Sequence, residues 1–168
     1  MMKQISIYLG IFLVLAISRF IPHPPNFTSL LALSFYVPAL LGLKYLPVLL
    51  ISFAITDLFI GYHTGTHWTW GSVLVIGLIS QYFCKNINFR LIGASTGAFI
   101  FFAITNFGVW ISSDMYANSF EGLLTAYVMA IPFFYNTLLS TIIYSVLIEF
   151  LYKVTKNKFS VSKWKVKF

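Results

Sequence analysis

Few polar side chains interrupt the apolar stretches of this sequence, and their types suit the binding of a small molecule. Asp57, Asn106 and Asn136 each lie inside a long apolar run, and Arg19 ends another. A polar or ionisable group is expensive to bury in a bilayer, so it indicates a functional site by default. Carboxylate and amide groups orient a ligand by hydrogen bonds, while aromatic rings supply apolar contact area. The predicted chemistry is recognition, with no bond made or broken.

The sequence contains no motif for catalysis or metal binding. It has no nucleophile–histidine–acid constellation, zinc-protease motif, phosphate-binding loop or dinucleotide fingerprint. The three histidines, His23, His63 and His67, lack the spacing of a zinc site, and the single cysteine, Cys84, excludes a cysteine cluster. We therefore expect no enzyme activity, no metal and no cofactor. A membrane enzyme with Asp57 and His23 as an acid–base pair is the weakest alternative.

Composition predicts a membrane protein. The 168 residues suit one domain, and 59% of them are apolar while only 9% are charged. Soluble domains have about 45–50% apolar and about 25% charged residues. So few charges could not cover the surface of a soluble fold of this size. The predicted fold class is therefore an all-α integral membrane protein.

Apolar runs of about 20 residues are needed to cross a bilayer, and the sequence predicts a bundle of six transmembrane helices. Pro22, Pro24 and Pro25 end the first helix, because proline donates no amide hydrogen bond and disfavours a helical residue before it. The second helix is short and contains Pro38, and a re-entrant second helix would leave five spans. Pro132 should kink the long sixth helix. The predicted spans are residues 5–21, 30–43, 45–62, 68–84, 91–111 and 123–154.

Basic residues predict how these spans are oriented. With six spans, ten of the 11 basic residues fall on the side of the two termini, and only Arg19 falls on the other. Basic residues concentrate on the cytoplasmic side, so both termini should be cytoplasmic, in the inner membrane of a bacterium. We divide the chain into a six-helix transmembrane domain, residues 1–152, and a basic cytoplasmic tail, residues 153–168. The tail should attract anionic lipid, and docking to a cytoplasmic partner or RNA is the less favoured interpretation. We expect no nucleic-acid partner.

Depth along the helices predicts that the polar residues gather in the external half of the bilayer. At about 1.5 Å per residue, Asp57 lies roughly 18 Å and Asn106 roughly 22 Å from the cytoplasmic side. Tyr135 and Asn136 lie near the midplane, and Arg19 closes the first helix on the outside. The inner half is almost entirely leucine, isoleucine, valine and phenylalanine. This asymmetry predicts a cavity that is open to the outside and sealed toward the cytoplasm.

The predicted binding residues combine these polar groups with aromatic rings at the same level. Arg19 and Asp57 could form an ion pair, which we interpret as functional because buried pairs are often neutral for stability. Trp70 and Trp110 either line the pocket or belong to the interfacial aromatic belt, to which we assign Trp68. The predicted substrate-binding residues are Arg19, His23, Asn26, Phe27, Asp57, Trp70, Asn106, Trp110, Tyr135 and Asn136.

Four segments of the sequence resemble a family of uncharacterised bacterial six-helix membrane proteins. They are Pro22–Thr28, Asp57–Phe59 with Gly61, Thr105–Trp110 and Pro132–Leu138. That family is similar to the substrate-binding S components of energy-coupling factor (ECF) transporters, which include solitary cobalamin carriers. The resemblance implies six helices, cytoplasmic termini and an outward-facing pocket for a vitamin or a metal. It also implies transmembrane and ATPase subunits as partners, besides a small-molecule substrate and the lipid bilayer.

Two features depart from that resemblance. Many S components dock their partner through an Ala-xxx-Ala face on the first helix, whereas residues 10–16 contain no such pair. Docking would then use another face, such as Gly93 and Gly97, or the protein works alone. Solitary cobalamin carriers can use a cysteine as the cobalt ligand, but Cys84 lies at the cytoplasmic end of its helix, which disfavours cobalamin.

The sequence therefore predicts a membrane protein that binds a small nutrient, such as a vitamin or its precursor, for transport. The alternative is a non-transporting scaffold of the kind that serves cell shape or envelope assembly. A scaffold needs no polar cavity, so a dry interior would favour it.

Overall fold

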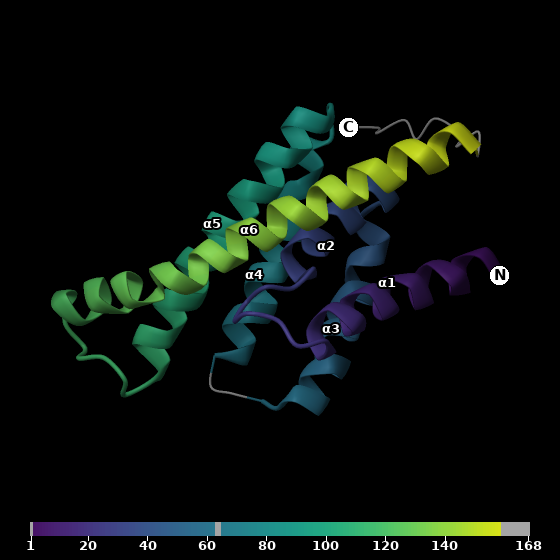
Figure 1. Cartoon of the computed structure of the whole chain (residues 1–168). Helices are drawn as coiled ribbons and strands as arrows, with labels where there is room; N and C mark the ends of the chain where they lie inside the picture. Colours follow the sequence, from purple (N-terminus) through teal and green to yellow (C-terminus); the bar gives the residue numbers. More distant parts are fainter. Residues whose placement is uncertain (1, 63–64, 159–168) are drawn as a thin grey trace.

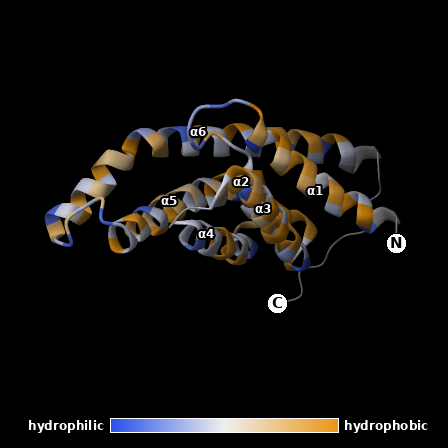
Figure 2. Ribbon diagram, turned by 90° about the horizontal axis from the view of Figure 1, so that it is seen from below, coloured by the Kyte–Doolittle hydropathy of each residue, from blue (hydrophilic) through white to orange (hydrophobic). Residues whose placement is uncertain are grey.

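The computed structural model describes residues 2–62 and 65–158, and this part of the chain folds into six α-helices, as predicted (Figure 1). The elements are α1 (Met2–Phe20), α2 (Leu30–Tyr36), the π-helical segment η1 (Val37–Leu41), the 3-10 turn η2 (Leu43–Tyr45), α3 (Leu46–Ile60), α4 (Thr66–Ile79), the 3-10 turn η3 (Ser80–Phe83), α5 (Ile87–Ser112) and α6 (Phe120–Lys158). Helix α6 passes through Pro132 without a break and curves along its length (Figure 2). It continues into the predicted tail as far as Lys158, and the rest of the tail lies outside the described residues.

Length and surface composition indicate a membrane protein. In the described chain, Leu43–Ile60, Ile87–Ser112 and Phe120–Thr155 are long and apolar enough to cross a membrane, whereas Gln4–Phe20 and Leu30–Leu41 are apolar but shorter. Large apolar side chains face outward, as Phe59 does with 77% of its surface exposed. Figure 2 shows that hydrophobic residues make up much of every helix. Exposure of such an extensive apolar surface to water is unfavourable, whereas contact with lipid tails is not.

Helix α2 lies in the middle of the bundle. It contacts every other helix, and its seven residues are all buried. Together with η1 it covers only about 18 Å, which is shorter than the roughly 30 Å apolar core of a bilayer. Pro38 lies within η1, and Gly42 ends the segment with a φ of 102°, which glycine adopts without strain. Irregular backbone at this depth is tolerated because protein surrounds it, and Gln81 donates to the Pro38 carbonyl at 2.8 Å.

The small residues of α5 pack inside the bundle. A Cβ atom built on Gly93 would meet the ring of Phe35 from α2, and one built on Gly97 would meet Ile76 from α4. The neighbouring alanines of α5 are also fully buried. This face is occupied by the protein's own helices, so it is not open to a partner subunit.

We expect Gly93→Ala to destabilise the protein by about 1–3 kcal/mol, the usual cost of overpacking a core. The added Cβ would lie 2.6 Å from ring atoms of both Phe35 and Phe83. Those rings pack edge to face with centroids 6.3 Å apart, so neither can retreat without disturbing the other. The matched control is Gly10→Ala in α1, where an added Cβ meets nothing within 4 Å. Unfolding in detergent should show a lower midpoint for Gly93→Ala alone, and equal midpoints would contradict this packing.

Candidate functional site

The proline-rich loop between α1 and α2 is fixed to the helices around it. The hydroxyls of Ser18 and Ser29 share a hydrogen bond of 2.7 Å where the loop leaves α1 and enters α2. From α6, Asn136 Nδ2 donates to the Pro25 carbonyl at 3.1 Å. Asn26 adopts a φ of 63°, a left-handed conformation that asparagine tolerates better than most residues. The loop therefore has a defined position beside α6.

Arg19 and Asp57 form the predicted ion pair between α1 and α3. Arg19 Nη2 lies 2.7 Å from Asp57 Oδ1, and the two side chains are only 13% and 8% exposed. Arg19 Nη1 also donates to Thr56 Oγ1, and the guanidinium lies 4.6 Å from the centre of the Phe53 ring. These contacts fix both the position and the orientation of the guanidinium.

Trp70 holds Asp57 from α4. Its indole Nε1 donates to Asp57 Oδ2 at 2.7 Å, so both carboxylate oxygens are engaged. The indole also packs against Phe53 and Tyr62. A ligand near this site would therefore meet a neutralised pair instead of a free carboxylate.

A cavity of about 320 Å³ lies beside the ion pair. Its walls come from the α1–α2 loop and from all six helices, with Phe53 and Phe101 as aromatic surfaces. The volume falls within the roughly 300–1,000 Å³ of small-molecule sites. The lining residues are Arg19, His23, Asn26, Thr28, Leu30, Leu31, Phe53, Asp57, Ile60, Thr69, Phe101, Thr137 and Ser140.

A smaller chamber of about 90 Å³ adjoins this cavity, and Asn106 reaches it from α5. Asn106 Nδ2 donates to the Phe102 carbonyl of the same helix at 2.7 Å, which leaves its carboxamide oxygen to accept from a ligand. Asn106 and Asn136 bond to different partners instead of to each other. The two chambers share Asn26, Phe101 and Thr137 as lining residues.

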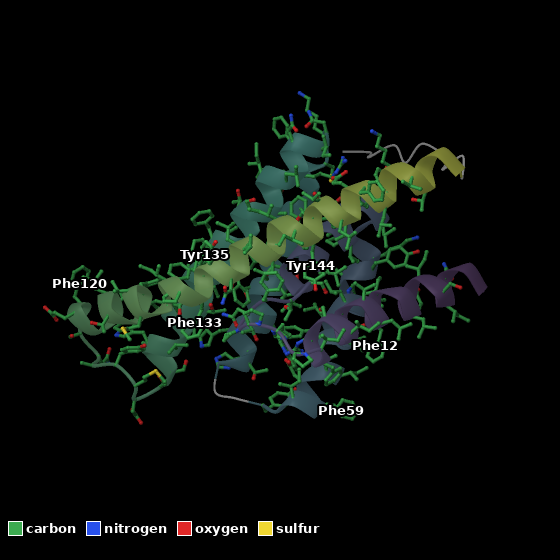
Figure 3. The ribbon with its side chains drawn as sticks, in the orientation of Figure 1. Phe12, Phe59, Phe120, Phe133, Tyr135 and Tyr144 are labelled. Atoms are coloured by element: carbon green, nitrogen blue, oxygen red, sulfur yellow. The ribbon has the colours of Figure 1, made fainter. Side chains whose placement is uncertain are left out.

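The remaining predicted residues lie away from these two chambers. Phe27 lines a more apolar hollow of about 420 Å³ between α1 and Tyr144 of α6, which shares His23 with the cavity. Trp110 Nε1 donates to a carbonyl of the α5–α6 loop at 3.0 Å. Tyr135 is 67% exposed and leaves α6 on a different side from Phe133, which lines the smaller chamber (Figure 3). The structure thus brings Arg19, His23, Asn26, Asp57 and Asn106 to the chambers. Trp70 bonds to Asp57 in the cavity wall, and Asn136 bonds to the α1–α2 loop that forms part of that wall.

Sequence reasoning missed the hydroxyl groups that α6 contributes to the cavity. Thr137 and Ser140 both line it, and both are buried. A threonine in a helix can bond to the carbonyl four residues earlier, as Thr137 does to Phe133 at 2.9 Å, so one such residue alone carries no signal. Their spacing of three residues, which places them on one face of the helix, is the signal that could have found them.

The prediction of an almost purely apolar inner half is wrong. Arg90 of α5 and Glu149 of α6 form a second buried ion pair, at the opposite end of the bundle from Arg19 and Asp57. Arg90 is one of the ten basic residues that predict the orientation of the helices, and no role was predicted for Glu149.

Histidine, cysteine and carboxylate side chains do not gather anywhere in the described ranges. No three of them lie close enough together in residues 2–62 and 65–158 to hold a metal ion. His23 lines the cavity, whereas His67 is exposed at the start of α4. His63 lies outside the described residues.

The fold and this site define a helical membrane protein with a polar cavity at one end of its helix bundle. Residues 1–163 match a family of unknown function (DUF6580), and the chain belongs to that family. No curated protein and no solved structure matches the chain. The likeness to S components therefore stays a prediction.

Proposed function

We propose that this protein binds a small nutrient in the cavity beside Arg19 and Asp57 and serves its transport across a bacterial cytoplasmic membrane. The observation that carries the proposal is a cavity of about 320 Å³ whose polar lining comes from separate helices. Hydroxyl, amide and imidazole groups can orient a ligand there, and Phe53 and Phe101 offer it flat apolar surfaces. A scaffold would need no such cavity, so this feature favours binding over the scaffold alternative.

The charges around the cavity suggest the class of ligand. Arg19 and Asp57 neutralise each other, and His23 is the other ionisable side chain among the lining residues. A strongly charged ligand would have to break the pair or stay unpaired, which is costly at a buried site. The site therefore suits a neutral or zwitterionic compound with polar edges and a partly aromatic body, as in a vitamin or its precursor.

In this proposal the protein works like an S component and carries out no bond chemistry. Energy would come from transmembrane and ATPase subunits or from trapping of the substrate in the cytoplasm. The small residues of α5 are already packed internally, so a partner subunit would use another surface. Mass spectrometry of small molecules that copurify with the detergent-solubilised protein tests the proposal. A recurrent compound is expected, and an empty protein purified from cells that contain vitamins would count against it.

We also propose that all six helices cross the membrane with both termini in the cytoplasm. The support is the distribution of the 11 basic residues. Ten of them fall on the side of the termini and one falls on the other side. Reporter fusions after Lys156 and in the loop at Asn118 should report opposite sides. A fusion at Lys85 should agree with the one at Lys156. An external C-terminus would contradict this topology.

A further inference from the structure

A second buried polar cluster lies at the end of the bundle away from the cavity. Arg90 Nε and Nη2 reach Glu149 Oε1 and Oε2 at 2.5 and 2.8 Å, and the side chains are only 12% and 6% exposed. Arg90 Nη1 donates to the Cys84 carbonyl at 3.4 Å, and its guanidinium lies 5.8 Å from the centre of the Tyr152 ring. Such a pair between two membrane-spanning helices is expensive and adds little stability, so it favours a functional role.

Two hydroxyls beside this pair make no hydrogen bond of good geometry. Within the described part of the chain, Tyr36 Oη and Ser145 Oγ are the buried side-chain atoms without such a bond. The Tyr36 hydroxyl is in contact with Glu149 and with the Ser145 hydroxyl, but these contacts fall short of good hydrogen-bond geometry. Buried polar atoms nearly always have well-formed hydrogen bonds, so two neighbouring hydroxyls with such loose contacts need an explanation such as water or a passing ligand. They belong to different helices, α2 and α6.

A line of polar side chains connects this cluster with the cavity. Thr137, Thr141, Ser145 and Glu149 follow one another at four-residue intervals on α6, and all four are buried. That spacing places them on one face, and at about 1.5 Å per residue the line covers roughly 18 Å. Thr137 lines the cavity, and Glu149 belongs to the second ion pair.

Helix packing alone does not account for the whole line. Thr137 and Thr141 donate to carbonyls of α6, as hydroxyls at helix interfaces commonly do. Ser145 does not, and neither does Tyr36, which faces it from the central helix α2. The π-helical segment η1 begins directly after Tyr36, and irregular helical turns of this kind are frequent at functional sites.

We propose that the chain contains its own translocation path, which runs from the cavity along this face of α6 and is closed by the Arg90–Glu149 pair. The proposal rests on the transport function inferred above and extends it, because the protein would then be a carrier and not only a binding subunit. The path suits a small polar solute that can replace water at hydroxyl groups. Separation of Arg90 from Glu149 opens its far end.

Cysteine accessibility tests the path without a known ligand. In a Cys84→Ser background, Ser145→Cys is exposed to a small charged thiosulfonate reagent in membrane vesicles of both orientations. The intact ion pair should protect this cysteine from the side of the chain termini. Glu149→Gln removes the pair and should raise its reaction rate from that side at least about tenfold, in proportion to the open population. An unchanged rate would overturn the proposal.

Two further variants separate opening from misfolding. Ser72 is fully buried in α4 and does not belong to the line of polar residues on α6, so Ser72→Cys should stay unreactive in every background. The exchange of Arg90→Glu with Glu149→Arg should restore the protection of Ser145→Cys. If the reaction rate rose at both Ser72→Cys and Ser145→Cys, or if the exchange did not restore protection, the ion pair would only stabilise the fold. Either result would refute its role as a gate.

The two proposals fail in different ways. A protein that retains its copurifying compound but shows no change in accessibility is a binding subunit without a path. A protein with the accessibility change but no retained compound keeps the path and loses the proposed site.

Discussion

Asp57→Asn should lower the free energy of unfolding by about 3–5 kcal/mol, the cost of leaving one partner of a buried ion pair uncompensated. In the native protein Arg19 Nη2 lies 2.7 Å from Asp57 Oδ1, and both side chains are largely buried. The asparagine keeps an oxygen for the Trp70 indole, which donates to the other carboxylate oxygen at 2.7 Å. Its NH2 group would then face the guanidinium, and two donors cannot satisfy each other. The loss of unfolding free energy therefore comes from the broken charge pair.

Thermal and denaturant unfolding in detergent measure this effect. Asp114→Asn removes the same charge at an exposed position and should change stability little, so it is the matched control. Combining Asp57→Asn with Arg19→Gln removes both charges and should recover part of the loss. A double variant no more stable than Asp57→Asn would mean that Arg19 and Asp57 do not interact.

The number of helices was predictable because strong local signals mark their ends. Pro22 follows α1, and Gly61, with a φ of 117°, follows α3. Hydropathy placed the start of the fifth helix at Leu91 because polar residues precede it. The helix begins earlier, since Asn86 caps it by accepting a hydrogen bond from the Phe89 amide at 3.1 Å.

For the candidate site, the position of each residue along its helix was predictable, but the direction of its side chain was not. Residue number fixes how far Arg19 and Asp57 lie along their helices, and both reach the same end of the bundle. The direction in which a side chain leaves its helix depends on packing that one sequence does not contain. Trp110 and Tyr135 were predicted to belong to the site, yet neither lines the chambers. Trp70 does not line the chambers either, and it contributes to the site by donating a hydrogen bond to Asp57.

The second ion pair was not predicted, and the reason is different. Arg90 and Glu149 are 59 residues apart in the chain. Arg90 precedes the predicted fifth span, and Glu149 lies near the end of the predicted sixth span, where charged residues are expected. Only the four-residue spacing from Thr137 to Glu149 was present in the sequence as a signal. It is weak, because serine and threonine occur on many helix faces without forming a connected line.

Asn106→Leu should lower ligand retention about five- to a hundredfold, which corresponds to about 1–3 kcal/mol for leaving a polar group of the ligand without its partner. Asn106 lines the smaller chamber, and its amide nitrogen is already bonded to the Phe102 carbonyl. The substitution removes an amide from apolar surroundings, so stability should stay the same or improve. Lost binding with retained stability separates a ligand contact from a structural hydrogen bond.

Asn136→Leu should behave differently, because the Asn136 amide holds the Pro25 carbonyl at 3.1 Å and its loss frees the loop beside the cavity. Both stability and retention should fall.

Asn88→Leu is the matched control for Asn106→Leu, since it makes the same substitution at an exposed position of the same helix. The measurements are the amount of copurifying compound per mole of protein, by mass spectrometry, and uptake by cells at equal protein level. Full retention and normal uptake in Asn106→Leu would exclude the smaller chamber and leave the cavity beside Arg19 and Asp57 as the site to test.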